Sequence, residues 1–414
     1  MNTEIHSSPL RVWLVCQYFP PEITAAAFRL GGLAGYLQNR GMEVTVLTSR
    51  PHRSGGIDTQ PDIHEAVRIL RVPVTARSHL GQYVQFLLGA RFRFRKDRRR
   101  FSPQAVLASS PPLSVFQVGR FLSRRTGAKL LLDVRDLWPD TPAALGRLRP
   151  GSRLFRFFKR FETRAYRGAE GISCVSRPMA EHIASSTSTP VVVAYNGVPA
   201  TDLAAAMELE RPKPPLKGEP LRVFYFGNLG LAQGLEILLR ASERLDPQDF
   251  QVHLVGDGVK RNLLSRHIRA AGLRHVHLHP ARPRPELLAE VARAAQVLFI
   301  HLSPQKVFSR TIPSKLFDYL LLRRPVVAGI NGEGAEILAK AGCAADFDPG
   351  RVDSLVGAMT RAARNWKELN ENAERNNMNL LRGFLREDQY AKMEVMIRAC
   401  CEPGKSGEKV GGSG

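Results

Sequence analysis

The stretch of sequence that decides the fold is VWLVCQYFPPEITAAAFRLGGLAGYLQNRGMEVTVL, residues 12–47. It opens on a short apolar run at 12–16, continues with a patterned segment at 25–39 and reaches a second apolar run at 44–47. The apolar runs are typical of buried strands, and the Arg40-Gly41 step marks the end of a helix between them. These residues predict a strand–helix–strand unit of a parallel sheet.

The same alternation continues along the chain. The next apolar runs lack the apolar–polar alternation of a half-exposed sheet, so they predict strands that are buried on both faces. They lie at 105–108, 129–134, 171–175 and 191–195. A polar stretch that ends in RPKPPLKGEP, residues 211–220, then favours a linker because its prolines and charges disfavour helix. Further strands are expected at 221–226, 251–255, 275–279, 297–300 and 325–328, with helices between them and a helical pattern after 352.

We therefore expect an α/β protein with two doubly wound, Rossmann-like domains facing a cleft, and with C-terminal helices that cross back. A length of 414 residues suits two or three domains. The expected division is a first domain at 1–198, a linker at 199–220, a second domain at 221–365, C-terminal helices at 366–403 and a disordered tail at 404–414.

The composition is that of an ordinary folded protein. Hydrophobic residues make up 43% and charged residues 24%, with 34 Gly and 28 Pro, which excludes collagen-like and disordered chains. The 60 Lys and Arg against 38 Asp and Glu give a net charge of +22, of which residues 1–200 carry +16. Such an excess favours anionic partners, among them phosphates, nucleic acid and acidic lipid surfaces.

The cysteines and the apolar runs bear on the cellular compartment. The five cysteines show no CxxC spacing, so neither a zinc site nor a disulfide framework is indicated. The first residues hold too few apolar side chains for a secretory signal, and no apolar run approaches the roughly 18 residues that span a bilayer. We therefore expect a cytoplasmic protein whose membrane contact is peripheral.

Two acidic residues stand where expected strands end. Asp136, in VRDLWPD, follows the strand at 129–134, and Glu22 lies in the loop after the first strand. A carboxylate at the carboxyl end of a parallel strand lies on the ligand side of the sheet, where it can act on a substrate hydroxyl, so both are candidate catalytic residues. For Asp136 the alternatives are an ion pair with Arg135 and a helix cap. Neither GxGxxG nor GxxxxGK[ST] occurs, so a nicotinamide-binding Rossmann site and a P-loop are not indicated.

The segment TIPSKLFDY, residues 311–319, predicts the start of a helix at a strand-to-helix junction. Pro313 suits the beginning of the helix, and Ser314 and Lys315 stand beside backbone N–H groups that lack partners within it. Such amides together with a lysine can hold a diphosphate. The alternative is a capped helix with a solvated lysine.

QYFPPE, followed by a helix of small residues and by RGMEVTVLTSRP, resembles the opening of bacterial glycosyltransferase family 4 enzymes of the GT-B fold. The resemblance is to those that build surface polysaccharides and exopolysaccharides, such as the colanic-acid type. Seven more motifs follow in the family's order over nearly the whole chain, which is far more specific than any one motif. They are LLDVRDLWPD at 131–140, VSRPMAEHI at 175–183, YNGV at 195–198, FGNLGLAQGLEILLRA at 226–241, VGDG at 255–258, TIPSKLFDYLLLRRPVVAG at 311–329 and NGEGAEIL at 331–338.

The resemblance implies a retaining enzyme whose second domain binds a nucleotide diphosphate sugar, with Lys315 on the diphosphate. In the family, two glutamates eight positions apart contact the donor, and those positions here hold Arg310 and Asp318. Asp318 can still accept hydrogen bonds from ribose hydroxyls, although it is one methylene shorter. Arg310 cannot be the acidic partner and is expected to contact phosphate instead.

The glycine loop GNLGLAQG departs from the family as well. It offers Asn228 and Gln233 where the family often has an Arg and a Lys, which adds hydrogen bonds but no charge and shifts the electrostatic role onto Lys315 and Arg310. No metal or other cofactor is expected, because the DFD at 346–348 precedes a helix that it can cap. By resemblance, the donor-binding residues are Asn228, Gln233, Gly256, Arg310, Ser314, Lys315, Asp318, Glu333 and Glu336.

Residues 80–101, LGQYVQFLLGARFRFRKDRRRF, predict a helix with an apolar end and a strongly cationic end. Such a helix suits an anionic bilayer surface or a lipid-linked acceptor. A second basic stretch at 147–167 interleaves phenylalanines with arginines. One alternative is that these are ordinary helices with solvated arginines. Another is nucleic-acid binding through stacked Phe and Arg side chains, which no known nucleic-acid-binding motif in the sequence supports. The residues expected at the membrane or acceptor are Arg91, Arg93, Arg95, Lys96, Arg98 and Arg99.

Together these observations predict a retaining glycosyltransferase. It would move a sugar, most simply from a UDP-sugar, to a polyprenyl-diphosphate-linked glycan at the inner face of the bacterial plasma membrane. Two other functions are open: a GT-B epimerase that acts on a nucleotide sugar without an acceptor, and a basic nucleic-acid-binding protein. The cationic helix disfavours the epimerase, because an enzyme that acts on a nucleotide sugar alone does not need a membrane-binding surface. The sequence leaves the sugar, the base, the linkage and the oligomeric state undetermined.

Overall fold

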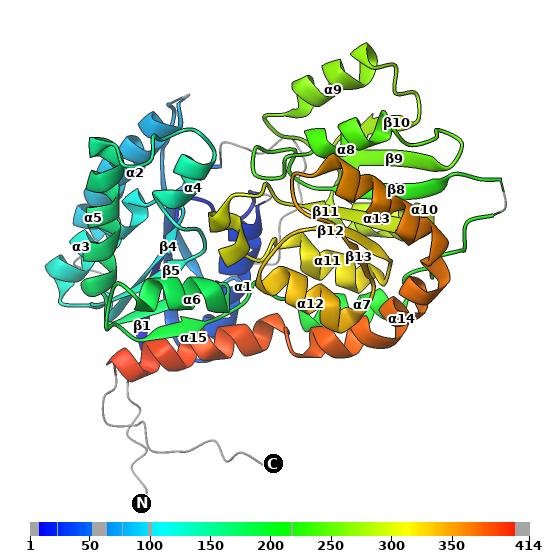
Figure 1. The fold of residues 1–414 in the computed structure, drawn as a ribbon. Coiled ribbons are helices and arrows are strands. Elements are labelled where there is room, and N and C mark those ends of the chain that lie inside the picture. Colours follow the sequence, from blue (N-terminus) through cyan, green and yellow to red (C-terminus); the bar gives the residue numbers. More distant parts are fainter. Residues whose placement is uncertain are drawn as a thin grey trace, which may run out of the picture. The chain divides into compact units, whose positions relative to one another are not determined.

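The computed structural model describes residues 8–22, 24–51, 64–76, 78–97, 102–216 and 218–401. These residues form two compact units (Figure 1). The first comprises the described residues of Met1–Ala143, Leu148–Asn196 and Glu387–Gly414, and the second comprises Ala144–Arg147 and the described residues of Gly197–Arg386. Each unit contains one parallel sheet with helices packed on it, which confirms the predicted α/β class with two doubly wound sheets.

The sheet of the first unit has seven strands in the order β3-β2-β1-β4-β5-β6-β7, and all of its neighbours are parallel. The order reverses between β1 and β4, which creates a switch point where ligands of such sheets bind. The strands are β1 (Arg11–Val15), β2 (Glu43–Ser49), β3 (Arg68–Val72), β4 (Ala105–Ser110), β5 (Lys129–Val134), β6 (Gly171–Cys174) and β7 (Val191–Val193).

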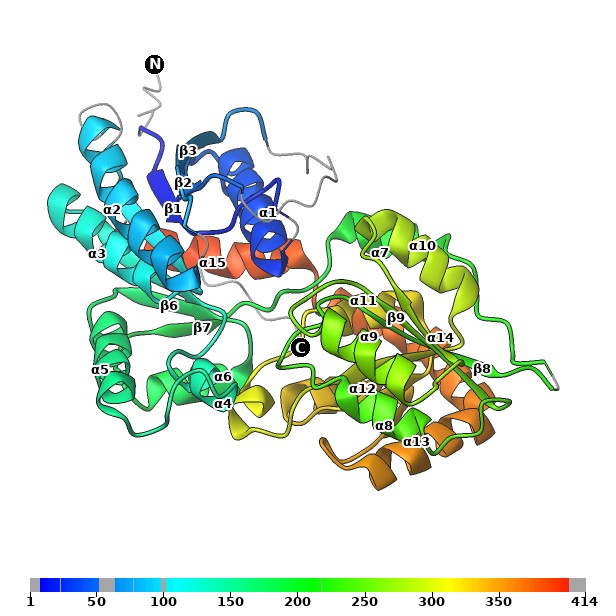
Figure 2. The same cartoon turned by 90° about the horizontal axis from the view of Figure 1, so that it is seen from above.

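Helices cover both faces of this sheet. Helix α1 (Ala25–Asn39) and helix α15 (Arg386–Cys401) pack on one face, where Leu30 and Leu33 meet Met393 and Ile397 in one apolar core with the strands. Helix α2 (His79–Asp97) and helix α3 (Ser114–Thr126) lie side by side on the other face (Figure 2). The remaining helices of the unit are α4 (Asp140–Ala144), α5 (Arg153–Arg167) and α6 (Arg177–Ala184).

Helix α1 shows why the predicted strand–helix–strand unit forms. The Thr24 side chain accepts a hydrogen bond of 3.1 Å from the Ala27 backbone N–H, which caps the first turn. The helix ends at Arg40, and Gly41 follows in the left-handed region with φ of 77°. The predicted helix at 25–39 is therefore confirmed, and it positions the loop that carries Glu22.

The sheet of the second unit has six parallel strands in the order β10-β9-β8-β11-β12-β13, with a switch point between β8 and β11. The strands are β8 (Leu221–Phe226), β9 (Phe250–Val255), β10 (Val276–His279), β11 (Val297–His301), β12 (Val326–Gly329) and β13 (Ala344–Asp346).

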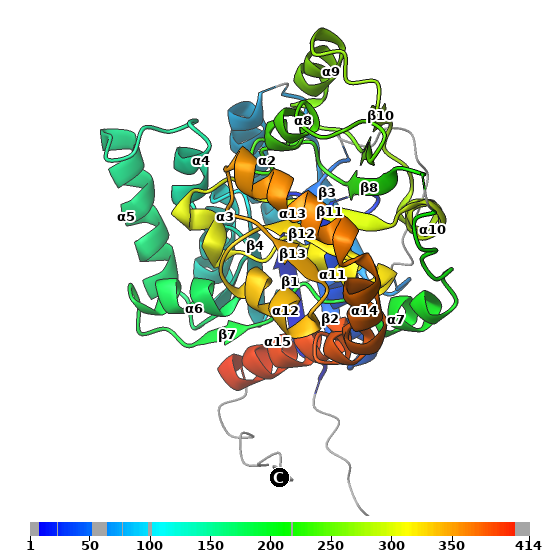
Figure 3. The ribbon, with the colours of Figure 1, turned by 45° about the vertical axis from the view of Figure 1, so that its right-hand side comes forward.

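The helices of this unit also lie on both faces. An apolar core joins the strands to α8 (Glu236–Ser242) and α13 (Val352–Arg364). Helix α14 (Trp366–Arg382) lies beside α11 (Lys315–Leu322) and α12 (Glu333–Ala341) (Figure 3). The other helical segments are α7 (Ala200–Met207), α9 (Arg261–Ala270), α10 (Arg284–Ala294) and the short 3-10 helix η1 (Lys306–Arg310).

Two features differ from the sequence predictions, and a third agrees with them. Strand β3 was not predicted, because its residues RILRV place arginines between the apolar ones. The segment at 199–220 begins with helix α7, because Pro199 only precedes its first turn, the other prolines lie from Pro212 onward, and ATDLAAAM between them is rich in alanine. The described residues after Arg386 fold with the first unit, in agreement with the prediction that the C-terminal helices cross back.

Candidate active site

Two glycine loops lie side by side at the carboxyl ends of β8 and β9 in the second unit. Gly227 has φ of 118° and Gly256 has φ of 151°, a region that glycine alone adopts readily. A Cβ on Gly256 would collide with the carbonyl oxygen of Gly227. The two loops therefore pack backbone against backbone, and Gly256, which the resemblance assigns to the donor site, is required by this close approach.

Lys315 is the first residue of α11 and lies against the first of these loops. Its amine contacts the Tyr225 hydroxyl and sits 3.8 Å from the centroid of the Tyr225 ring. A Cβ added to Gly227 would come 3.2 Å from the same amine. The Tyr225 hydroxyl in turn donates a 2.6 Å hydrogen bond to the Asn228 carbonyl oxygen. Tyr225, which the sequence analysis did not single out, thus connects Lys315 to the glycine loop.

The surroundings of Lys315 favour an anionic ligand. Burial lowers the pKa of Lys315 to about 7, an effect that the nearby charge of Asp318 only partly opposes. The amine also lies at a helix N-terminus, where the helix dipole adds positive potential. Ser314, the preceding residue, is exposed and forms no side-chain cap. The lysine is thus not the solvated side chain of a capped helix, and a bound anion would stabilise its charged form.

Asn228 and Gln233 fold over the middle of the glycine loop. A Cβ on Gly230 would come 2.6 Å from both the Asn228 amide nitrogen and the Gln233 side-chain oxygen. The Gln233 backbone carbonyl accepts from the His301 ring at 2.7 Å, which fixes the loop to the end of β11. The buried Gln233 side-chain oxygen has no hydrogen-bond partner among the described residues, so it can accept a bond from a ligand.

Arg310, Glu333 and Glu336 lie on two adjoining segments. Arg310 is the last residue of η1, and the two glutamates occupy the first turn of α12. Glu333 is buried, whereas Glu336 is exposed. A Cβ on Gly332, just before α12, would collide with the Ser309 carbonyl oxygen, so the start of α12 packs against η1. Beside them is a hollow of about 270 Å³ that the sequence analysis did not anticipate, lined by Leu302, Ser303, Pro304, Gln305, Lys306, Phe308, Ser309, Asn331 and Pro349.

Asp318 lies one turn beyond Lys315 on α11 and forms an ion pair. The Arg284 guanidinium approaches its carboxylate at 2.6 Å and also binds Asp202 of α7 at 2.6 Å. Neither Arg284 nor Asp202 was singled out from the sequence. The structure therefore places Lys315, Asp318, Asn228 and Gln233 around the switch point of the second sheet.

In the first unit, Asp136 follows β5. Its carboxylate accepts a 2.6 Å hydrogen bond from the Thr141 hydroxyl, and burial raises its pKa to about 6. The neighbouring Arg135 donates its Nε hydrogen to Ser109 at 3.0 Å and forms no ion pair with Asp136. Of the alternatives, a pair with Arg135 is thus not observed. A carboxyl group with a pKa near 6 can take up a proton close to neutral pH, which suits a general base.

Glu22 lies in the loop between β1 and α1 and is buried. Its charge acts on the guanidinium of Arg71, at the end of β3. Arg71 donates to the Pro20 carbonyl at 2.6 Å and to the Ser49 carbonyl at 3.3 Å, so it ties the loop to the sheet. Arg71 was not among the predicted site residues, because the strand that carries it, β3, was not predicted.

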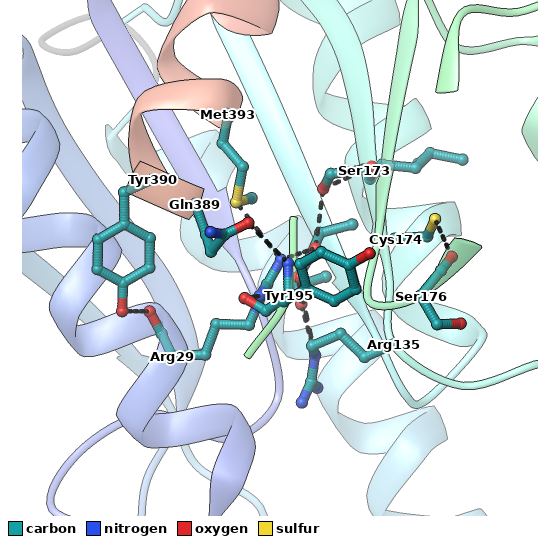
Figure 4. A network of polar contacts seen from close by, with 12 residues as sticks. Arg29, Arg135, Ser173, Cys174, Ser176, Tyr195, Gln389, Tyr390 and Met393 are labelled. Atoms are coloured by element: carbon teal, nitrogen blue, oxygen red, sulfur yellow. Dashed lines mark hydrogen bonds and ion pairs between the residues drawn. The ribbon is translucent and has the colours of Figure 1, made fainter. Parts of the chain in front are cut away.

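A buried network holds the end of β5 in place (Figure 4). The Arg29 guanidinium pairs with the Asp133 carboxylate at 3.0 Å and donates to the Tyr195 carbonyl at 2.9 Å. Ser109 and Ser173 donate to the same carboxylate at 2.7 and 2.8 Å. Burial alone would raise the pKa of Asp133, but the charges of Arg29 and Arg135, together with hydrogen bonds from Ser109 and Arg29, outweigh it and the pKa is lowered. Asp136 lies only three positions after Asp133 in the chain, so the network also anchors the candidate base.

The basic helix α2 carries an exposed apolar stripe. Val84, Leu88 and Phe92 follow one another at four-residue spacing, and their side chains are 47%, 58% and 73% exposed. Arg95 is exposed, whereas Arg91 and Arg93 are half-buried. Lys96 lies in the helix without a described side chain, and Arg98 and Arg99 lie outside the described residues.

Helix α5 presents a second cationic face. Leu154 and Phe157 on this helix are more than half exposed. They stand among exposed arginines that recur every three or four residues, namely Arg153, Arg156, Arg160, Arg164 and Arg167.

Two features are absent from the described residues. Among them, no three His, Cys, Asp or Glu side chains come together in a way that could hold a metal ion. In the same part of the chain, no helix combines the length and apolar character needed to cross a membrane.

The sequences of both units are similar to known glycosyltransferase domains. Residues 24–197 match the model of the glycosyl transferase 4-like domain, and residues 206–379 match that of glycosyl transferases group 1. WcaI of Escherichia coli K12, whose name places it in colanic acid biosynthesis, is 24% identical over 381 residues, covering 83% of this chain and 90% of WcaI. The glycosyltransferase WbjE of Pseudomonas aeruginosa is 23% identical over 343 residues, covering 79% of this chain and 82% of WbjE.

Solved structures show the same fold. HepE of Anabaena, in complex with UDP and glucose, superposes with a TM-score of 0.65 and 16% identity, covering 94% of this chain and 100% of the HepE chain. The fold of the chain is therefore that of the two-domain GT-B proteins.

Proposed function

Because the chain belongs to the bacterial glycosyltransferases of family 4 and is a transferase of the hexosyltransferase class, we propose that it moves a sugar from a UDP-sugar to a lipid-linked glycan. The acceptor is a polyprenyl-diphosphate-linked glycan or one of similar chemistry. The product enters a bacterial surface polysaccharide or exopolysaccharide. The name of WcaI, a colanic acid biosynthesis glycosyl transferase, supports this choice of product.

The observation that supports donor binding most directly is the position of Lys315. Its amine lies at a helix N-terminus, against Tyr225 and beside the backbone of Gly227. A diphosphate bound there would pair with the amine and lie at the positive end of the α11 dipole. HepE, which shares the fold, was solved with UDP and glucose, and this supports uracil as the base of the donor.

The leaving group is stabilised by the protein's own charge. As the bond between the sugar and the diphosphate breaks, negative charge grows on the diphosphate, and Lys315, Arg310 and the amides next to Ser314 stabilise it. Asn228 and Gln233 add hydrogen bonds, and Glu333 and Glu336 bind hydroxyls of the sugar. The proposal requires no cofactor, since these groups supply the charge that departure of the diphosphate demands.

The acceptor half of the proposal rests on the first unit. Asp136, with its pKa raised to about 6 by burial, receives the proton of the attacking hydroxyl, and Glu22 orients that hydroxyl. The acceptor attacks from the face that the diphosphate leaves, so the anomeric configuration is retained.

The acceptor's lipid places the reaction at the inner face of the plasma membrane. The apolar stripe of α2 inserts among the lipids, while Arg91, Arg93, Arg95, Lys96, Arg98 and Arg99 bind anionic headgroups. The arginine face of α5 supports the same surface, because exposed Leu154 and Phe157 suit a bilayer better than a nucleic acid.

Thermal-shift screening with UDP-, GDP- and CMP-linked sugars tests the donor site. A ligand present at 100 times its Kd stabilises the native state by about 2.7 kcal/mol. We expect a rise in melting temperature with a UDP-sugar that Lys315→Ala loses and that the control Lys340→Ala, an exposed lysine of α12, retains. No rise with any sugar nucleotide would contradict the donor site. Conversion of the sugar nucleotide without any acceptor would identify an epimerase instead.

A further inference from the structure

The carboxylate of Asp318 is held by one oxygen only. Both hydrogen bonds from Arg284, from Nη2 at 2.6 Å and from Nε at 3.2 Å, end on Oδ1 of Asp318. The other oxygen, Oδ2, receives no hydrogen bond from a described residue. Asp318 is 24% exposed, so a ligand can reach this second oxygen.

Arg284 is itself held from a third helix. Its Nη1 donates to Oδ2 of Asp202 at 2.6 Å. The guanidinium from the start of α10 thus bridges α7 and α11, and the planar geometry of the fork fixes the direction of each bond. Arg284 has a carboxylate on both sides, so it does not offer an open phosphate site.

Opposite charges are separated near the start of α11. Lys315 faces the glycine loop and is the cation when an anion is bound, whereas Asp202, Arg284 and Asp318 together carry one net negative charge. Asp318 lies one turn further along the helix than Lys315 and within electrostatic reach of it. A ligand with a diphosphate at one end and neutral hydroxyls next to it matches this order, since the negative cluster repels phosphate and accepts from hydroxyls.

We propose that Arg284 is a positioning residue that turns Oδ2 of Asp318 toward the vicinal hydroxyls of the donor's ribose, with Asp202 holding Arg284 in place. This inference rests on the proposed function and deepens it, because it makes the enzyme selective for ribonucleotides over deoxyribonucleotides. An aspartate has about 1.5 Å less reach than a glutamate. The bridge fixes the direction of the shorter side chain.

Calorimetric binding of UDP, 2′-deoxy-UDP and 2′,3′-dideoxy-UDP tests the inference on the full-length protein. A hydrogen bond to a charged group is worth a factor of roughly 10 to 100 in affinity. We expect the wild type to bind UDP at least about tenfold more tightly than the dideoxy nucleotide. Arg284→Gln should reduce this ratio to about threefold or less while leaving the affinity for the dideoxy nucleotide unchanged. Asp318→Asn should do the same, and Asp202→Asn should lower the ratio in part.

The matched control is Arg244→Gln, which breaks another arginine–aspartate pair of the second unit, with Asp353 at 2.7 Å. It should leave the ratio as in the wild type. Equal binding of all three nucleotides by the wild type would overturn the inference while leaving the donor site intact. An equal loss for all three nucleotides in Arg284→Gln would also overturn it, because Arg284 would then act on the fold or the phosphates. Failure of the wild type to bind any of them would overturn the proposed function together with the inference.

Discussion

Lys315 should make donor binding depend on pH in a definite direction. In the free protein, burial lowers the pKa of the Lys315 amine to about 7 from its ordinary 10.5. A bound diphosphate favours the charged amine and restores a pKa well above 9. Binding of UDP above pH 7 must therefore take up a proton, and the affinity must fall as the pH rises. The terminal phosphate of UDP loses its second proton near pH 6, so its own charge is constant above pH 7.5.

The size of the effect follows from the fraction of protonated lysine in the free protein. With a pKa of about 7, roughly a quarter of the molecules carry the Lys315 proton at pH 7.5, and about one in a hundred does so at pH 9. The Kd for UDP should therefore rise about 20-fold between these values, which corresponds to about 1.8 kcal/mol. Isothermal titration calorimetry in buffers with different ionisation enthalpies should show an uptake of about 0.9 proton at pH 8.

Two variants separate the lysine from other titrating groups. Lys315→Arg keeps its charge throughout this range and should bind UDP with a Kd that does not change with pH. Lys315→Ala should bind weakly, also without pH dependence. A wild-type Kd that varies by less than threefold between pH 7.5 and pH 9 would refute this account of Lys315. The lowered pKa of Lys315 also makes the free energy of unfolding depend on pH. The unfolded chain keeps the lysine proton up to about pH 10.5, whereas the folded protein releases it near pH 7. The ligand-free protein should therefore gain stability as the pH rises from about 7 to about 10.5.

Three further outcomes follow from the structure. Asp136→Asn should lower kcat by roughly 10²- to 10⁴-fold while the Kd for UDP stays unchanged, and a loss of less than threefold in a transfer assay would exclude a role as base. Phe92→Ser should reduce sedimentation with anionic vesicles about tenfold, whereas Val395→Ser, which replaces another exposed apolar residue, should not; equal binding by both variants would contradict insertion of α2. Asp133→Asn leaves the guanidinium of Arg29 buried without its ion pair, so urea unfolding should show a loss of about 3 kcal/mol or more, and an unchanged midpoint would show that the pair is dispensable.

Local patterns were sufficient for most of the fold. The predicted strands at 12–16 and 44–47 correspond to Arg11–Val15 and Glu43–Ser49, and the helix at 25–39 was found with the predicted bounds. These elements follow from apolar runs and from cap residues next to them in the chain. Strand β3 was missed because Arg68 and Arg71 interrupt its apolar residues, although it pairs in parallel with β2 at the edge of the sheet. Helix α7 was missed because the prolines further along the linker dominated the interpretation.

The contacts within the candidate site could not be predicted in the same way. The sequence indicates that Lys315 begins a helix, but it does not indicate that Tyr225, 90 residues earlier, lies against its amine. Arg29 and Asp133 are 104 residues apart. A charged residue within an apolar strand or helix is a signal that a buried partner exists, and both of these residues carry that signal. The identity of the partner depends on the sheet order, which one sequence alone does not reveal.

Helix α15 has a consequence for how the protein is made and how it can be re-engineered. The residues from Glu387 to Cys401 complete the core of the first unit, where the Tyr390 hydroxyl donates to the Arg29 carbonyl at 2.9 Å. On the ribosome, the second unit is therefore synthesised in full before the first unit receives its last helix, so the N-terminal half is the later of the two to finish folding. A chimaera that exchanges donor specificity between relatives needs two junctions, near Asn196 and near Arg386, so that α15 stays with the strands it covers.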